Sequence, residues 1–300
     1  MTIKKEDILL PGSLQLIAKK AVEGFIIGLH KSPYHGFSVE FAEHRSYNSG
    51  DSAKDIDWKL YARTDKLFVK KYEEETNLRA MIVLDNSSSM HYPKNTKSKI
   101  NDSILCSAAL LYLLEKQNDA FGICFFNQKI DYQTDVKSTK SHLARLFALL
   151  EIELIKAQIS AKTEISQSLQ QIAETNNRGS LVIIFTDFLH NNLDEVFSAI
   201  GHLRFNRHEV IVFHLFDNRT EKMFDFDNRP YLFEDLETGE KIKIEPDSVK
   251  NSYTQRISNL HRNIKEKCAK LKVDYVPLDL TNPVHQVLSK FLQKRGVMKS

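Results

Sequence analysis

The chain is predicted to be an α/β protein with a doubly wound, mostly parallel sheet, one antiparallel edge strand and a small N-terminal α+β lobe. Three observations indicate this class. From residue 78 onward, apolar runs of strand length alternate with amphipathic segments of helix length, the pattern of a mostly parallel sheet. The runs at 81–84, 181–185 and 210–213 are almost continuously apolar, as expected of strands covered on both faces. The chain of 300 residues can bury roughly three quarters of its unfolded surface, enough for a large core.

The main domain, residues 78–300, is expected to alternate strands and helices along its length. Its strands are placed at residues 79–85, 120–126, 180–186, 209–216 and 272–277. Its helices are placed at residues 98–116, 140–156, 164–176, 191–204, 247–271 and 282–294. A short strand near 129–134 should return antiparallel to 120–126 as an edge. Residues 230–245, with a turn at Thr238-Gly239, predict a hairpin inserted before the longest helix.

Residues 1–77 are expected to form the separate N-terminal lobe. Apolar side chains at helical spacing predict a helix over residues 13–30, with a start signal at Pro11-Gly12-Ser13. Alternating patterns predict strands near 37–41 and 67–72, and a short helix is expected at 55–63. The single tryptophan, Trp58, is expected to pack this lobe against the sheet.

Composition excludes several classes of protein. The net charge is +3, from 42 basic and 39 acidic residues, so no global basic field favours nucleic acid. The three cysteines are far apart and form no Cys-x-x-Cys pair, which argues against a zinc site or disulfides and favours a reducing cytoplasm. The N-terminus lacks the apolar core of a signal peptide, and no segment has the ~20 clean apolar residues of a membrane span.

Glycine spacing excludes three further classes. Neither Gly-x-Gly-x-x-Gly nor a phosphate loop ending in Gly-Lys-Ser/Thr is present, so a dinucleotide fold or a nucleoside triphosphatase of that kind is not expected. The Gly-x-Ser-x-Gly motif of α/β hydrolases is also absent.

The most informative motif is Asp85-x-Ser87-x-Ser89, which follows a buried apolar strand. One carboxylate and two hydroxyls at this spacing can surround a small hard cation such as Mg²⁺. The alternative is a plain turn in which a serine caps the next helix. A second buried strand ends in Asp187, and Thr163 precedes an amphipathic helix between the two strands. Thr163 could place a hydroxyl on the same rim of the sheet or act only as a helix cap.

The order Asp85-x-Ser87-x-Ser89, then a threonine loop, then Asp187 resembles the metal-ion-dependent adhesion site of von Willebrand factor A domains. The segment between residues 45 and 75 is similar to the hallmark of the DUF58 family. Together the two motifs cover roughly residues 30 to 215. The residues that carry the family motif are Arg45, Tyr47, Gly50, Asp51, Asp55, Asp57, Trp58 and Arg63.

The resemblance implies a von Willebrand A-like domain that binds Mg²⁺, with Mn²⁺ or Ca²⁺ as alternatives. Ser87, Ser89 and Thr163 would be the hydroxyl ligands, and Asp85 and Asp187 the carboxylates. An open coordination position would take an acidic side chain of a partner protein. The resemblance also implies work with a MoxR-type AAA+ ATPase in complex maturation or a chaperone-like process.

Two positions depart from the adhesion-site pattern. Many A domains have glycine beside the threonine, but Thr163 has none, so Thr139 is the alternative third hydroxyl ligand. Phe188 follows Asp187 where glycine is frequent, although Asp-Phe does resemble the DUF58 version. Next to the site, Lys94, Lys97 and Lys99 are expected to decorate a solvated helix start.

The segment 41–80 carries eight basic and eight acidic residues. Equal numbers favour an internal ion-pair network that locks the lobe, with a partner-recognition surface as the alternative. A buried ion pair can specify a fold even where it adds little stability.

We expect a binding protein and not an enzyme. The competing hypothesis is a Mg²⁺-dependent phosphohydrolase that uses Asp85. Such sites require a second carboxylate two residues later for acid–base catalysis, where this chain has Ser87. A third hypothesis is a metal-free scaffold with a degenerate site.

Overall fold

The structure is a computed structural model. The chain forms two compact units. The smaller consists of Ile26–Asn77, and the larger consists of Met1–Phe25 together with Leu78–Ser300. The structure describes residues 13–30, 44–46, 58–70, 78–94, 98–127, 129–155, 165–175, 178–189 and 192–299.

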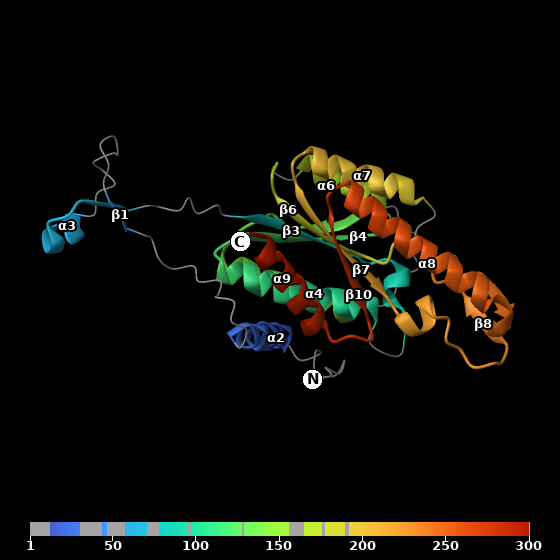
Figure 1. Cartoon of the computed structure of the whole chain (residues 1–300). Helices are drawn as coiled ribbons and strands as arrows, with labels where there is room; N and C mark the ends of the chain where they lie inside the picture. The colour runs from blue at the N-terminus through green and yellow to red at the C-terminus, as the bar shows by residue number, and fades with distance from the viewer. Residues whose placement is uncertain are drawn as a thin grey trace. The chain divides into compact units, whose positions relative to one another are not determined.

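The larger unit is built on a six-stranded sheet with the strand order β10-β7-β6-β3-β4-β5 (Figure 1). All neighbours in this sheet are parallel except β4 and β5, which pair antiparallel at one edge. This arrangement confirms the predicted fold class. The strands are β3 (Arg79–Asp85), β4 (Ala120–Phe126), β5 (Ile130–Gln133), β6 (Leu181–Thr186), β7 (Glu209–Phe216) and β10 (Asp274–Asp279).

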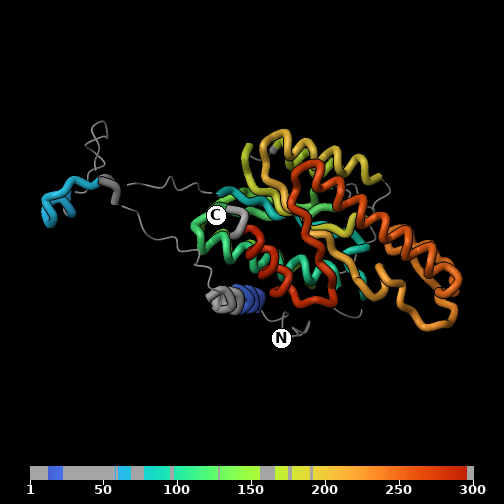
Figure 2. The backbone as a smooth tube through the Cα atoms, in the orientation of Figure 1, coloured from blue at the N-terminus to red at the C-terminus, as the bar shows by residue number. Residues whose placement is uncertain are grey.

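Helices cover both faces of this sheet (Figure 2). One face carries α4 (Lys99–Lys116), α5 (Lys140–Ile155) and α9 (Val284–Lys299). The other face carries α6 (Ile165–Thr175), α7 (Leu193–Phe205) and α8 (Pro246–Lys270). A separate two-stranded hairpin, β8 (Tyr231–Glu234) and β9 (Lys241–Ile244), precedes α8 as expected.

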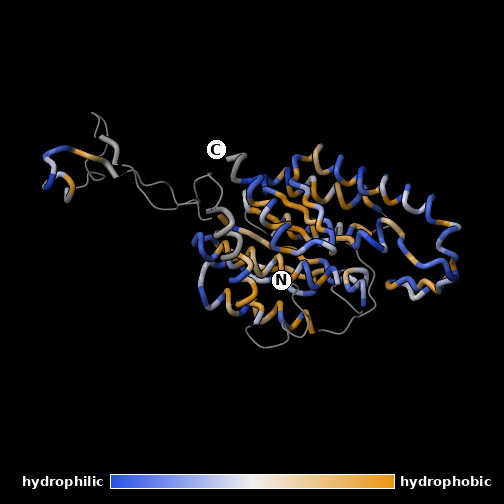
Figure 3. Tube along the Cα trace, turned by 60° about the horizontal axis from the view of Figure 1, so that its bottom comes forward, coloured by the Kyte–Doolittle hydropathy of each residue, from blue (hydrophilic) through white to orange (hydrophobic). Residues whose placement is uncertain are grey.

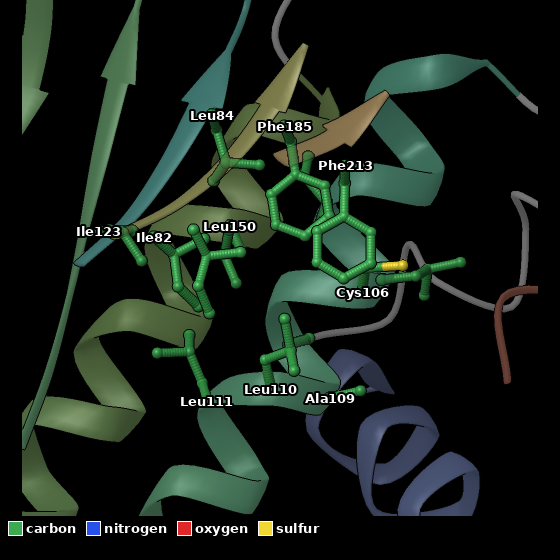
Figure 4. Close-up of a cluster of buried hydrophobic side chains, with 14 of the residues drawn as sticks. Ile82, Leu84, Cys106, Ala109, Leu110, Leu111, Ile123, Leu150, Phe185 and Phe213 are labelled. Carbon is green, nitrogen blue, oxygen red and sulfur yellow. The ribbon is translucent and has the colours of Figure 1, made fainter. Parts of the chain in front are cut away.

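The two faces of the sheet define two hydrophobic cores. Successive side chains of a strand point to opposite faces, so Ile82 and Leu84 of β3 enter one core whereas Met81 and Val83 enter the other. In the first core, Leu110 and Leu111 of α4 face the strands, and the rings of Phe185 and Phe213 stack 4.6 Å apart (Figure 4). Figure 3 shows the apolar residues gathered along the central strands of this unit.

The N-terminal helix α2 (Ser13–His30) corrects one predicted boundary. Its residues Leu14, Ala18 and Val22 are buried in the first core of the larger unit. The stretch up to Phe25 therefore belongs with this unit, whereas the prediction assigned residues 1–77 to a separate lobe. The reason is its apolar stripe, which a helix can bury only against another apolar surface.

The smaller unit contains a short antiparallel pair, β1 (His44–Ser46) with β2 (Phe68–Lys70), and the helix α3 (Trp58–Thr64). β1 was not predicted, and the strand expected near 37–41 lies outside the described residues. Trp58 is 58% exposed within the described residues and meets the ring of Tyr61 edge-on. The expected packing of Trp58 between the lobe and the sheet stays a prediction.

Two further findings concern the described residues. Cys106, Cys124 and Cys268 are free and buried. In the part of the chain that the structure describes, no helix is both long enough and apolar enough to cross a membrane.

Candidate metal site

The two predicted carboxylates lie at one edge of the sheet. Asp85 is the last residue of β3, and Asp187 directly follows β6. These strands are parallel neighbours, with Leu84 opposite Phe185, so both aspartates leave the sheet at its carboxyl edge. This edge is where open α/β sheets bind ligands.

The side chain of Asp85 is fully buried and is held from two sides. Its Oδ1 accepts the Ser87 N–H at 3.0 Å, and its Oδ2 accepts the hydroxyl of Thr186 at 2.7 Å. Asp85 therefore ties its own loop to the neighbouring strand. Sequence reasoning missed Thr186, although its position at the end of β6, just before Asp187, was a usable signal.

The hydroxyls of Ser87 and Ser89 lie side by side. Their Oγ atoms are 3.1 Å apart, and adjacent ligands of an octahedral Mg²⁺ lie about 3 Å apart. A 3₁₀ turn, η2 (Ser88–His91), follows Ser87 and produces this approach. Ser87 is buried whereas Ser89 is partly exposed, so the pair leads from the interior to the surface. Two hydroxyls at this spacing fit one hard cation.

Lys99, the first residue of α4, places a positive charge next to Asp187 at this edge of the sheet. Its Nζ donates to Asp187 Oδ2 at 2.7 Å and to Glu221 Oε1 at 2.6 Å. Its side chain has 0% exposure, so the expected solvated helix start is wrong at this residue. Glu221 belongs to a π-helical turn, η3 (Asn218–Lys222), which was not predicted.

The buried ion pairs keep Lys99 charged. Burial alone would lower the pKa of Lys99, but the negative charges of Asp187 and Glu221 outweigh it and hold the pKa above the usual lysine value. Asp187 Oδ1 also accepts the Leu189 N–H at 3.1 Å. Asp187 is thus fixed by an ammonium group and a backbone amide.

The alternative ligand Thr139 is in the wrong place. Its Oγ1 accepts the His142 N–H at 3.2 Å, as a cap of α5. Nearby Lys137 pairs with Phe121 near the start of β4, whereas Asp85 lies opposite Phe126 at the end of that strand. The five residue-to-residue steps from Phe121 to Phe126 span about 16 Å. Thr139 therefore belongs to the opposite edge of the sheet and cannot complete this site.

The other predicted residues are placed as follows. Six of them lie outside the described residues: Tyr47, Gly50, Asp51, Asp55, Asp57 and Thr163. Arg45 lies in β1, Trp58 begins α3, and Arg63 is exposed on α3. The ion-pair network expected in this segment stays a prediction. In the described ranges, no group of three or more His, Cys, Asp or Glu side chains could hold a metal. A site of the adhesion type differs because hydroxyls supply most of its ligands.

Phe188, directly after Asp187, has a backbone conformation that favours glycine. Its φ is +54°, in the left-handed region that glycine adopts without strain. The phenyl ring is buried, stacked on Phe197 at 5.7 Å and edge-on to His214 at 5.4 Å. Aromatic packing therefore offsets the unfavourable backbone conformation at this position.

Three known proteins are similar to this chain over between 47% and 83% of its length. The curated "Uncharacterized protein Mb1516" of Mycobacterium bovis is 22% identical over 251 residues, which cover 83% of this chain and 77% of that protein. The hypothetical protein BatB of Bacteroides thetaiotaomicron has a solved structure with a TM-score of 0.46 and 16% identity, covering 74% of this chain and 100% of that one. A von Willebrand factor type A structure from Catenulispora acidiphila has a TM-score of 0.34 and 13% identity, covering 47% of this chain and 34% of that one.

A family model also matches the chain. The family model described as "Protein of unknown function DUF58" matches residues 43–263, more than half of the chain, and the chain therefore belongs to the DUF58 family.

Proposed function

We propose that this protein is a metal-dependent binding module that captures an acidic side chain of a partner protein. Ser87, Ser89 and Thr163 would hold Mg²⁺, with Asp85 and Asp187 as the carboxylates of the site. The single observation that supports this most directly is the 3.1 Å separation of the Ser87 and Ser89 hydroxyl oxygens. Mn²⁺ or Ca²⁺ are the alternative ions.

The charges around the site favour capture of an anion. Hydroxyl ligands are neutral, so the bound cation would keep most of its charge and attract a carboxylate through a charge-assisted bond. Lys99 offsets the charge of Asp187 through its 2.7 Å ion pair. Asp85 is turned inward, toward Ser87 and Thr186. The protein thus leaves the partner to supply the negative charge.

A binding role agrees better with the geometry than phosphohydrolysis does. A nucleophilic carboxylate must reach the phosphorus atom, but Asp85 has 0% exposure and both of its oxygens accept hydrogen bonds. The family resemblance further suggests a MoxR-type AAA+ ATPase as the partner and a role in complex maturation or chaperone-like action. The spacing of the three cysteines favours a cytoplasmic location.

The first test is calorimetric titration of Mg²⁺, Mn²⁺ and Ca²⁺ into the full chain. The variant Ser87→Ala/Ser89→Ala should bind at least tenfold more weakly, because it removes two ligands. A matched control is Ser103→Ala/Ser107→Ala, which removes two buried hydroxyls that donate only to carbonyls of α4. Equal metal affinity in the wild type and the Ser87/Ser89 variant would contradict the assignment. If the wild type gives no heat of binding, the titration is repeated with acetate as a surrogate for the partner carboxylate. No heat of binding in the presence of acetate would reject the site.

A further inference from the structure

We propose that the amino edge of the sheet is a docking surface for an anionic lipid bilayer. This edge lies at the opposite end of the strands from the candidate metal site and would bind without a metal ion. It comprises the turns that lead into β6, β7 and β10, the helix ends before them, and the part of α9 around Arg295. We call this surface the basic edge, and its described residues are 174–175, 178–180, 202–209, 266–274 and 291–295.

The three turns of the basic edge lie side by side. β6, β7 and β10 are parallel neighbours, with Leu181 opposite Glu209 and Asp274 opposite Ile211. The Glu209 N–H also donates to the Ser180 carbonyl at 3.0 Å, just before β6 begins. Side chains from these turns therefore share one surface.

Positive charge is in excess at the basic edge. It carries eight basic residues against four acidic ones, namely Arg178, Arg204, Arg207, Lys267, Lys270, Lys272, Lys294 and Arg295 against Glu174, Glu209, Glu266 and Asp274. Lys267 also pairs with Asp194 of α7 at 2.6 Å. When Asp194 is counted with the acids, an excess of three positive charges remains, equal to the net charge of +3 of the entire chain.

Two arginines hold the basic edge together. Arg204 donates to the carbonyls of His208 and Leu271 at 2.6 and 3.2 Å, so it joins the turns that follow α7 and α8. Arg295 of α9 pairs with the carboxylates that begin β7 and β10. The turns are thus fixed relative to one another, and two acids of the surface are already compensated.

Four outer basic side chains remain for an anionic partner. They are exposed, and none of them forms an ion pair with another described residue: Arg178, Arg207, Lys270 and Lys272. Each basic residue close to an anionic bilayer strengthens binding about fivefold. Four of them give an association that is weak, reversible and sensitive to salt.

The backbone at two of these residues is unfavourable for a basic side chain. Arg207 and Lys272 have φ values of +64° and +54°, in the left-handed region that glycine and asparagine adopt at least cost. In the turns before β4 and β6 the left-handed residues are Asn118 and Gly179. Packing does not explain Arg207 and Lys272, since both are exposed. Strained positions of this kind point to a role in binding.

An aromatic side chain protrudes from the same surface. Phe205, the last residue of α7, is 86% exposed, more than any other large apolar side chain among the described residues. It lies in sequence between Arg204 and Arg207. A bilayer suits this combination, because its headgroups carry negative charge and the acyl layer beneath them accepts a phenyl ring. Duplex nucleic acid has the charge but no such apolar layer.

Docking at the basic edge would leave the candidate metal site facing away from the lipid. β6 runs from the basic edge to Asp187, and its six residues span about 20 Å. A bilayer and a protein partner would thus be bound at opposite edges of one sheet.

The test is co-sedimentation of the full chain with lipid vesicles, with a chelator present so that no divalent metal contributes. Vesicles of phosphatidylcholine alone are compared with vesicles in which about a quarter of the lipid is phosphatidylglycerol. We expect binding only to the anionic vesicles, and its loss at about 1 M salt, where the screening length is about 3 Å. Equal binding to both kinds of vesicle, or binding to neither, would overturn the proposal.

The variant Arg207→Gly/Lys272→Gly removes two outer charges without impairing the fold. Vesicle binding should weaken about thirtyfold. The midpoint of thermal unfolding should not fall, because glycine relieves both left-handed positions. The control Lys129→Gln/Lys243→Gln removes two exposed charges outside the basic edge and should leave binding unchanged. An equal loss in the variant and the control would show that net charge alone is responsible, which contradicts a specific surface.

The variant Phe205→Ser distinguishes a bilayer from other polyanions. It removes the exposed ring and keeps every charge, so vesicle binding should weaken about tenfold while binding to duplex DNA does not change. Vesicle binding that is insensitive to Phe205→Ser would overturn the bilayer proposal and leave a surface for polyanions such as duplex nucleic acid.

Discussion

At the scale of single residues, Lys99 is the most consequential side chain outside the ligand set. It begins a helix, where exposed lysines are common, yet it has 0% exposure and joins two carboxylates. Buried charges of this kind are stable only while they are compensated. The ammonium group is therefore the internal counter-charge that lets Asp187 and Glu221 lie close together beneath the rim.

Replacing Lys99 by Met should destabilise the protein by about 3–5 kcal/mol, since the buried Asp187 and the partly buried Glu221 would lose their shared cation. The measurement is urea unfolding followed by circular dichroism. The double variant Lys99→Met/Glu221→Gln should recover part of the loss. Lys140→Met is the control, because Lys140 is also the first residue of a helix but is exposed. An unfolding free energy that falls equally in Lys99→Met and the control would refute this role.

At the scale of elements, the antiparallel edge depends on a close backbone approach at Gly122 of β4. A Cβ added there would lie 2.9 Å from the carbonyl oxygen of Asp135 and 3.0 Å from Thr134 Oγ1. The same Thr134 oxygen accepts the Ile123 N–H at 2.9 Å. The segment after β5 can therefore follow β4 only because residue 122 has no side chain.

Gly122→Ala should cost about 1–3 kcal/mol of unfolding free energy, because the inserted methyl group forces this segment outward. Gly201→Ala is the matched control, for which we expect the opposite change in unfolding free energy. Gly201 is in the middle of α7, and its nearest neighbour would be Leu271 Cδ2 at 3.9 Å, an ordinary contact. Alanine there should stabilise the protein by about 0.5–1 kcal/mol through helix propensity. Two shifts of the same sign in thermal unfolding would contradict one of the two assignments: two losses the one for Gly201, and two gains the one for Gly122.

Most elements were predictable, and the errors at their ends have local causes. β10 begins at Asp274, not at residue 272, because Lys272 has a φ of +54° in the turn that ends α8. α9 begins at Val284, not at residue 282, because Asp279 accepts the Thr281 N–H at 2.9 Å in a turn of its own. β1 has three residues, too few for a recognisable alternation.

At the scale of the whole molecule, two histidines connect the sheet to α8. His214 of β7 is buried, and its ring lies 4.6 Å from that of His261. Its Nδ1 is 2.8 Å from the hydroxyl of Tyr275 on β10. Burial, helped by His261, lowers the pKa of His214 to about 3, against the smaller opposing effect of Asp187. Burial and then Lys222 lower the pKa of His261 to about 4.

Stability should consequently fall in mild acid. Between the folded pKa of about 3 for His214 and the unfolded value of about 6.5, the unfolded chain binds the extra proton, so stability is complete above this window and is lost as the pH falls through it. At pH 5 the contribution of His214 should be a loss of about 2 kcal/mol relative to pH 7.5. Urea unfolding at the two pH values, in the presence of a chelator, measures it.

The variant His214→Phe isolates this effect. It removes the titrating group, keeps an aromatic ring beside Phe188 and leaves the Tyr275 hydroxyl without its partner. We expect lower stability at pH 7.5 but a smaller loss on acidification. A variant as acid-sensitive as the wild type would show that other groups carry the pH dependence.

The sequence by itself determined the features that arise from neighbouring residues. Apolar runs and helical periodicity predicted the doubly wound sheet with its antiparallel edge, because these patterns reflect which faces must be buried. The Asp85-x-Ser87-x-Ser89 motif predicted two adjacent hydroxyls, because both residues lie in one turn after a strand.

Only the tertiary structure decided which distant residues meet. Thr186 reaches Asp85 across 101 residues, and Lys99 reaches Asp187 across 88 and Glu221 across 122. Tertiary structure likewise places Thr139 at the far edge of the sheet. It also places α2 against the core of the larger unit. The physical reason is that a side chain's partners depend on strand order and helix packing, which no local pattern records.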